Sequence, residues 1–345
     1  MLNNELFILS ALTISILSIL VMLLVYLTFR KTIENKNRQT IENYKKKYNP
    51  LIFMIINEGS YSRKLTPETA LQKKAIEELL TQYTKILEGE DEKQRLTELA
   101  GMYLTEYYQK RLNSKKWSTR MNTLYHIEDF NLNQFSNDVY MLTKKKQLSH
   151  QELLHILRIL ALFQYEPIVE LITKHYRYLS EFEYRYILIR LSKQNFDQFV
   201  LNFHKSGFEL QKAILNVISI KRELGYLAFL ENVFSSYSGE VRLRALKALA
   251  DIGFVKDSSP YLEFLYSEKW EERMIAAKLI GSLMEEKGIP RLIELLHDPT
   301  WWVRSQAGQA ICQFANGYDI LRSVLETSKD AFAKDMAWEW LHKGV

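Results

Sequence analysis

Cysteine, proline and glycine are scarce in this sequence, with one, six and twelve residues respectively among 345. The single cysteine, Cys312, excludes an intramolecular disulfide and a cysteine-based zinc cage. It follows Ile311 in an apolar pattern, which predicts a small core residue. Proline and glycine destabilise helix interiors, so their scarcity favours long helices. Between short polar turns the chain shows one helical pattern after another, which predicts an all-α fold.

The motifs of common catalytic and cofactor sites are also missing. The sequence contains no His-Glu dipeptide, and therefore no HExxH zinc motif, and no P-loop, GxSxG or GxGxxG motif. Of the seven histidines, the two nearest are His150 and His155, whose spacing of five is not the i, i+4 spacing of helical metal pairs. We therefore expect no catalytic residue, no cofactor and no metal site, and we expect that the protein is not an enzyme.

Positive charge is concentrated in one short segment. The formal net charge is +5, and residues 30–64 alone carry nine Lys or Arg against three Glu. The rest of the chain is close to neutral. A nucleic-acid-binding protein usually carries a basic stripe on its folded domain, so the charge distribution argues against a nucleic-acid partner.

Residues 6–29 form an uncharged apolar run. A helix of this length, at about 1.5 Å per residue, crosses a hydrocarbon core of about 30 Å. A cleaved signal peptide is the alternative, but it needs a basic start and a small-residue cleavage site. Residues 1–5 contain no Lys or Arg, and the run ends at Arg30 and Lys31. We therefore predict an uncleaved transmembrane helix and a contact with the lipid bilayer through residues 6–29.

The flanking charges predict the topology of this helix. Arg30 and Lys31 begin the basic segment, and the positive-inside rule places that side in the cytoplasm. The expected protein is a single-pass protein of the cell membrane, with residues 1–5 outside and the body in the cytoplasm. Residues 30–65 are predicted to be a basic juxtamembrane linker. Its helix should end at Asn49–Pro50, because the residue before a proline disfavours the α conformation.

Two features of the linker leave alternatives open. Lys45–Lys47 either contact anionic lipid headgroups or only fix the topology. The apolar run 51–56 is too short to span a membrane, and we expect a buried helix, with a membrane-surface segment as the alternative. Thr66, followed by Pro67 and Glu68, is a helix start signal, so the body is predicted to begin at residue 66.

A pattern with a period of 31 residues runs through the C-terminal third. Its most visible members are Arg242, Arg273 and Arg304. Small and large apolar residues follow at fixed offsets, namely Ala245, Ala276 and Ala307 three residues on, and Leu249, Ile280 and Ile311 seven residues on. A fixed period of this size is typical of stacked helical repeats. Alanines allow close helix approach, and the larger residues fill the groove of the next unit.

The pattern resembles HEAT repeats, in which a turn with Asp and Pro precedes a helix that opens with Val-Arg. The best match is His297–Asp298–Pro299, followed by Val303–Arg304. The resemblance implies a right-handed α-solenoid of helical hairpins behind the membrane helix. We expect HEAT-like repeats with a C-terminal cap over 207–345. Degenerate helical repeats are expected over 66–206, with faded copies near Arg120 and Arg185 and no clear register between 150 and 206.

The same resemblance implies a structural role for Arg242, Arg273 and Arg304. In HEAT-like families an arginine at this position often pairs with an acid in a neighbouring turn, and Asp298 is a candidate for that partner. A clamp for a phosphate or a peptide is the alternative reading of the three arginines.

Residues that the repeat does not explain are the candidates for partner binding. Trp302 stands where HEAT units usually have a polar residue, near Gln306, and an exposed Trp is a good interface anchor; a packed Trp is the alternative. Tyr184 and Tyr186 belong to a tyrosine-rich stretch that suits a peptide groove, unless it only reflects composition. Trp270 and Trp301 occupy one repeat position and are expected to be apolar staples.

These features predict an interaction protein that recruits or positions a protein partner, such as a membrane protein, at the cytoplasmic face of the membrane. A regulatory subunit of a membrane enzyme, such as a glycosyltransferase or a transporter, is the alternative. An enzyme of the HEAT-like bilin lyase or DNA glycosylase type fits less well. Such an enzyme has little reason to be anchored in a membrane, and the neutral body does not suit DNA.

Overall fold

The computed structural model describes residues 2–60, 64–145 and 148–343, and every regular element within these ranges is a helix. This confirms the predicted all-α fold for the described part of the chain. Met1 of the predicted segment 1–5, residues 61–63 of the predicted linker and the last two residues of the predicted cap lie outside it. The chain forms two compact units, Met1–Tyr165 and Glu166–Val345.

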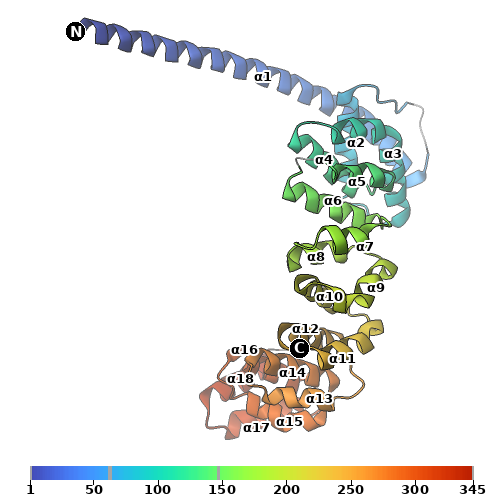
Figure 1. Cartoon of the computed structure of the whole chain (residues 1–345), viewed down its shortest axis with the longest axis vertical. Helices are drawn as coiled ribbons and strands as arrows, with labels where there is room; N and C mark the ends of the chain where they lie inside the picture. Colours follow the sequence, from blue (N-terminus) through green and yellow to red (C-terminus); the bar gives the residue numbers. More distant parts are fainter. Residues whose placement is uncertain (1, 61–63, 146–147, 344–345) are drawn as a thin grey trace. The chain divides into compact units, whose positions relative to one another are not determined.

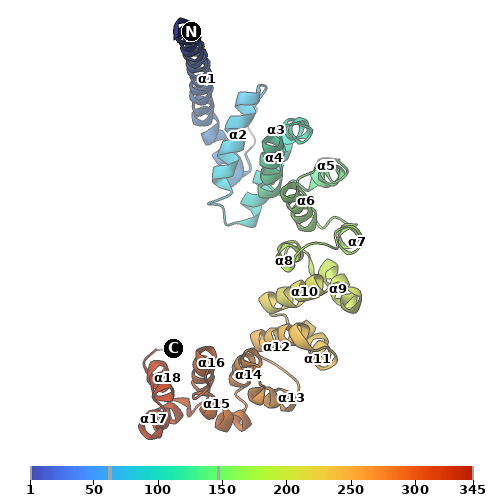
Figure 2. The same ribbon diagram turned by 60° about the vertical axis from the view of Figure 1, so that its left-hand side comes forward.

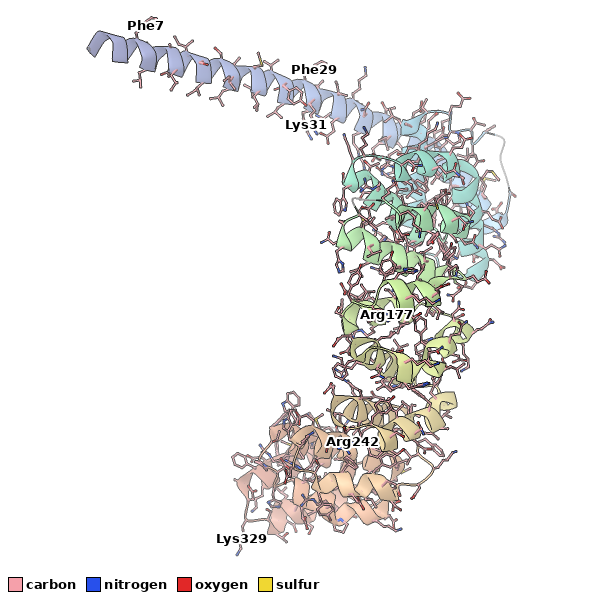
Figure 3. All side chains as sticks on the ribbon, in the orientation of Figure 1. Phe7, Phe29, Lys31, Arg177, Arg242 and Lys329 are labelled. Carbon is pink, nitrogen blue, oxygen red and sulfur yellow. The ribbon has the colours of Figure 1, made fainter. Side chains whose placement is uncertain are left out.

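The first unit begins with one helix of 57 residues, α1 (Leu2–Glu58), which projects from the rest of that unit (Figure 1). Its apolar side chains at Phe7 and from Leu9 to Phe29 are exposed and lie away from the rest of the unit (Figure 3). Within Leu9–Glu58 the helix is long and apolar enough to cross a membrane, by length and composition.

The predicted end of this helix at Asn49–Pro50 is wrong, because α1 continues through Pro50 to Glu58. Pro50 lies on the exposed side of the helix, where water can reach the carbonyl group that loses its hydrogen bond. Tyr48 and Ile52 are buried on the opposite side, and this burial favours the continuous helix. Within the range predicted to be a linker, Arg38 donates to the Glu78 carboxylate of the following helix at 2.7 Å, and Ile41 is buried.

The rest of the first unit packs around the end of α1. Its helices are α2 (Ala70–Tyr83), α3 (Glu90–Leu112), α4 (Trp117–Asp129), α5 (Ser136–Leu142) and α6 (His150–Leu162). The run 51–56 is part of α1, and its three isoleucines are buried against α2 and α3. Arg95 closes this end of α1 by donating 2.8 Å hydrogen bonds to the carbonyl oxygens of Ile56 and Asn57. The helix start predicted at Thr66 lies at Thr69, which forms a capping box with Gln72.

The second unit consists of helical hairpins. Its helices are α7 (Ile168–Glu170), α8 (Glu181–Leu188), α9 (Lys193–Leu201), α10 (Phe208–Lys221), α11 (Leu227–Ser236), α12 (Gly239–Ile252), α13 (Ser259–Leu262), α14 (Trp270–Leu283), α15 (Ile289–Leu295), α16 (Trp301–Ile311), α17 (Gly317–Thr327) and α18 (Ala331–His342). The even-numbered helices from α8 to α18 pack against one another in sequence order. The odd-numbered helices α9, α11, α13 and α15 form a separate outer layer (Figure 2).

The repeat register of this unit follows from the starts of the even-numbered helices. Arg242, Arg273 and Arg304 are each the fourth residue after the N-cap of α12, α14 and α16. The alanines and larger apolar residues three and seven positions on are completely buried. In α10 and α8 the fourth residues are Gln211 and Tyr184. The register between 150 and 206 therefore places Tyr184, and not Arg185, at the arginine position.

Tyr184 and Gln211 make equivalent contacts, which supports this register. The Tyr184 hydroxyl donates to the carbonyl oxygen of Tyr176 at 2.8 Å, and Nε2 of Gln211 donates to the carbonyl oxygen of Phe203 at 3.0 Å. Each acceptor lies eight residues before its donor, in the turn that leads into the helix. A hydroxyl or an amide thus ties helix to turn where later repeats use a guanidinium group.

Candidate functional site

Arg273 connects two successive hairpins. Its Nη1 donates to the carbonyl oxygens of Ser267 and Glu268, at 2.7 and 3.0 Å, in the turn before its own helix. Its Nε and Nη2 donate to the two carboxylate oxygens of Asp298, at 2.7 and 3.0 Å, in the next turn. Two parallel hydrogen bonds fix both distance and orientation. The contact expected of Asp298 with a repeat arginine is therefore present and is made by Arg273.

The same arrangement occurs in the first unit. Nη1 of Arg120 donates to the carbonyl oxygens of Ser114 and Lys115, and its Nε and Nη2 donate to Glu152 at 2.6 and 2.8 Å. Hydrogen bonding to Glu152 raises the pKa of Arg120. The faded sequence copy near Arg120 thus has the contacts of Arg273, with a glutamate in the place of Asp298.

Arg242 and Arg304 vary this arrangement. Arg242 contacts Glu272 at 3.3 Å, while Nη1 of Arg304 donates to the carbonyl oxygen of Asp298 at 2.8 Å. The Arg304 guanidinium group lies 4.8 Å from the Phe332 ring centre, and only 9% of the residue is exposed. All three repeat arginines are thus engaged within the protein, which favours a role in hairpin stacking over a clamp for a ligand.

In the described part of the second unit, one face of the even-numbered helices remains uncovered. We call it the free face and define it by a row of four residues, Asn216, Lys247, Lys278 and Gln309, each the ninth after the N-cap of its helix. All four are exposed or half-buried, and their helices α10, α12, α14 and α16 pack side by side. The row has the same 31-residue spacing as the arginines, five positions later, so the sequence contained a signal that could have identified it.

The predicted Trp302 and Gln306 lie on α16 with Gln309. Trp302 is 59% exposed, and its ring meets that of Trp301 edge-on at 4.8 Å. Nε2 of Gln306 donates to Oε1 of Gln309 at 2.9 Å, which links it to the row of the free face. The alternative of a packed Trp302 is thus wrong. Trp270 and Trp301 are also more exposed than apolar staples should be.

The two tyrosines predicted to bind a partner lie in different environments. Tyr184 is only 2% exposed, so its prediction as a contact residue is wrong. Burial raises the pKa of its hydroxyl group. Tyr186 is 41% exposed, with its ring centre 4.6 Å from that of Phe182. The tyrosine cluster therefore contains both a core residue and a surface residue. Their closeness in sequence does not show which of them is buried.

A hollow of about 640 Å³ opens between α8, α10 and α12. The residues that line it are Arg185, Asn216, Ser219, Ile220, Arg222, Lys247 and Asp251. The Asp251 carboxylate accepts hydrogen bonds from the Ser219 hydroxyl and the Lys278 ammonium group. Sequence reasoning missed this site because its residues come from three helices and share no motif.

The first unit contains a buried polar cluster that joins α2, α3 and α4. The Glu77 carboxylate contacts Nε2 of His126 at 3.2 Å and the ammonium group of Lys74. Burial alone raises the pKa of Glu77, but His126 and Lys74 outweigh it and lower the pKa to about 2. Burial and the nearby Glu77 charge raise the pKa of Tyr108. Among the described residues, no group of three His, Cys, Asp or Glu side chains is arranged to hold a metal ion.

Comparison with known proteins agrees with the repeat architecture. The family profile of HEAT repeats matches residues 227–312, so the helices from α11 to α16 include HEAT-like helical repeats. No curated protein matches the chain.

Three solved structures of designed or engineered proteins are similar to the chain. One engineered protein is 16% identical with a TM-score of 0.40, and the alignment covers 84% of this chain and 87% of the other. A second engineered protein is 17% identical with a TM-score of 0.28, and the alignment covers 68% of this chain and 94% of the other. A designed armadillo repeat protein is 15% identical with a TM-score of 0.22, and the alignment covers 84% of this chain and 98% of the other.

Proposed function

We propose that the protein is a membrane-anchored scaffold whose second unit, part of a right-handed α-solenoid, holds a protein partner on the free face. The observation that carries the proposal is Trp302, which is 59% exposed beside the polar row of that face. A largely exposed tryptophan is a typical centre of a protein interface. The HEAT-like repeats supply a rigid row of helices to present it.

The proposed membrane attachment is residues 6–29 of α1. Arg30 and Lys31 follow this stretch directly, so the positive-inside rule puts the body in the cytoplasm. Lys45, which the sequence offered as a lipid contact, is engaged with Glu42 and Glu78 at 3.2 and 3.4 Å. We therefore assign Lys45 to the packing of α1 on α2 and leave headgroup contact to the exposed Lys46 and Lys47.

Photo-crosslinking in intact cells tests the partner site. A photoreactive amino acid at position 302 should give a specific protein adduct. The same amino acid at Tyr318, an exposed aromatic residue of α17, is the matched control. No adduct from position 302, or equal adducts from both positions, would contradict the proposal. If the captured partner is a glycosyltransferase or a transporter, its turnover with and without this chain separates a scaffold from a regulatory subunit.

A reporter fused after Val345 tests the orientation. A fluorescent protein that matures only in the cytoplasm should be active, and an alkaline phosphatase that needs an oxidising compartment should be inactive. Arg30→Glu with Lys31→Glu should reduce this bias, because the Lys and Arg asymmetry sets the orientation. An active phosphatase on the unchanged chain would show that the assignment is inverted.

A further inference from the structure

We infer that the hollow between α8, α10 and α12 binds a short acidic segment of the partner protein, through Arg185, Arg222 and Lys247. This inference rests on the proposed scaffold function and names the chemistry of the partner. Arg185 lies in α8, Arg222 directly follows α10 and Lys247 lies in α12, and the three cations line one open hollow of about 640 Å³. A space of this size accommodates a few side chains of an extended peptide.

These three cations differ from the neighbouring cations in their lack of ion pairs. Lys212 pairs with Glu209 at 2.9 Å, Arg244 pairs with Glu240 at 2.7 Å, and Lys278 pairs with Asp251. Among the described residues, by contrast, no carboxylate lies within ion-pairing distance of Arg185, Arg222 or Lys247. These three neighbouring cations are thus paired, whereas the three that line the hollow carry no paired carboxylate in the described part of the chain.

The lining of the hollow completes a site for carboxylates. Its one acid, Asp251, already accepts from Ser219 and Lys278, so it opposes an incoming carboxylate less than a free acid would. The Arg185 guanidinium group rests 4.9 Å from the Phe182 ring centre, which restrains it at the rim. Asn216 adds a neutral polar group and Ile220 an apolar contact. A second hollow among the described residues of this unit, about 520 Å³, is lined by two basic and three acidic residues and lacks this excess.

The surroundings favour a short acidic peptide over a nucleic acid. Three carboxylates, Glu181, Glu209 and Glu240, lie on the same helices beside the hollow. Their pairing with Lys212 and Arg244 leaves no continuous basic track along these helices for a polyanion, whereas a peptide with a few acidic residues needs only the hollow. Nucleic-acid sites combine continuous basic grooves with aromatic side chains for stacking, and the lining of the hollow contains no aromatic residue.

Fluorescence anisotropy with the full chain in a neutral detergent tests the site. The probe is a fluorescein-labelled octaglutamate peptide. The triple variant Arg185→Glu, Arg222→Glu, Lys247→Glu should bind it at least about tenfold more weakly, because three charge contacts become repulsive. The matched control, Lys205→Glu, Lys256→Glu, Lys329→Glu, changes the net charge equally at exposed lysines outside the hollow. It should bind within about twofold of the unchanged chain.

A peptide of opposite charge distinguishes a lost site from a misfolded variant if octaglutamate binding is lost. An octalysine peptide should bind the triple variant of the hollow more tightly than the unchanged chain, which a misfolded variant would not do. Equal octaglutamate binding by the unchanged chain and the triple variant would overturn the inference. So would tighter binding of single-stranded oligo(dT) through the same three residues, because it would identify a nucleic-acid site.

The crosslinking experiment separates this inference from the function on which it rests. The triple variant should lose most of the adduct formed from position 302, and the control variant should retain it. If both keep the adduct, the scaffold function stands and the acidic segment binds elsewhere or does not exist. If the unchanged chain forms no adduct, the scaffold function itself is wrong, whatever octaglutamate does.

Discussion

Arg273 and Asp298 join two successive hairpins through a pair of parallel hydrogen bonds, 2.7 Å from Nε and 3.0 Å from Nη2. Both side chains are largely buried, with 11% and 4% of their surface exposed. The pair repeats the geometry of Arg120 and Glu152 in the other unit. A contact that recurs in both units belongs to the way in which hairpins of this chain stack.

The first prediction concerns this pair. Asp298→Ala leaves a largely buried guanidinium group without its carboxylate partner and should cost about 3 kcal/mol of stability, as broken buried pairs do. Urea unfolding followed by tryptophan fluorescence measures it. Glu326→Ala is the control, because Glu326 is exposed and forms no ion pair with any described residue. Equal midpoints for the two variants would show that the pair does not stabilise the stack.

The second prediction concerns the closest approach of α14 and α16. A Cβ atom at Gly281 would lie 2.7 Å from the Cα atom of Ala310, so Gly281→Ala must push the two helices apart. We expect a loss of about 1–3 kcal/mol, as for other overpacked interfaces. Gly207→Ala is the matched control, since nothing lies within 4 Å of its added Cβ. Thermal unfolding of the two variants should differ, and the opposite order would contradict the packing of α14 on α16.

The third prediction separates two tyrosines that are close in sequence. Tyr184→Ala removes a buried ring and should cost about 3–5 kcal/mol. Tyr184→Phe removes only the hydrogen bond to the Tyr176 carbonyl and should cost about 1 kcal/mol. Tyr186→Ala should change stability by less than about 0.5 kcal/mol, because Tyr186 is at the surface. A larger loss for Tyr186 than for Tyr184 would invalidate the repeat register assigned to α8.

The fourth prediction is a pH dependence that originates at Glu77. Its pKa is lowered to about 2 in the folded protein, against about 4.3 in an unfolded chain. A lowered folded-state pKa gives stability that is fully present above pH ~4.3 and is lost as the pH falls toward about 2. Glu77→Gln should therefore lower the urea midpoint at pH 7, and its deficit should shrink between pH 4.3 and pH 3.

The control for this pH dependence is Glu106→Gln, a change at an exposed residue of the same unit. Its stability should follow that of the unchanged chain at every pH. A Glu77→Gln deficit that stays constant from pH 7 to pH 3 would mean that the carboxylate charge does not stabilise the cluster with His126 and Lys74.

The sequence predicted the contacts that depend on residue type at a fixed spacing. Arginines every 31 residues, with Asp298 in the following turn, were sufficient to predict the ion pair. The predicted repeat register was wrong by one position at Arg185. At Tyr184 and Gln211 a hydroxyl and an amide donate the hydrogen bond to the preceding turn that a guanidinium group donates in other repeats. Matching by residue type cannot detect an equivalence that exists only in hydrogen-bonding geometry.

Other features could not be read from the chain because they depend on packing. A proline favours a helix end before Pro50, but the burial of Tyr48 and Ile52 on the opposite side of the helix outweighs this tendency. The basic hollow depends on which cations find partners across neighbouring helices. Lys278 is neutralised by Asp251 and Lys247 is not, although the two occupy equivalent positions.

The unbroken α1 has a mechanical consequence for the proposed anchor. Eleven residues of uninterrupted helix separate Phe29 from the buried Ile41, a rise of about 18 Å along the axis. Ile52 and its neighbours lock the far end of the same helix into the first unit. Rotation of the anchor about its axis would therefore also rotate α2 to α6. A flexible tether would let the first unit rotate independently of the anchor, whereas the continuous helix couples the orientation of α2 to α6 to that of the anchor in the bilayer.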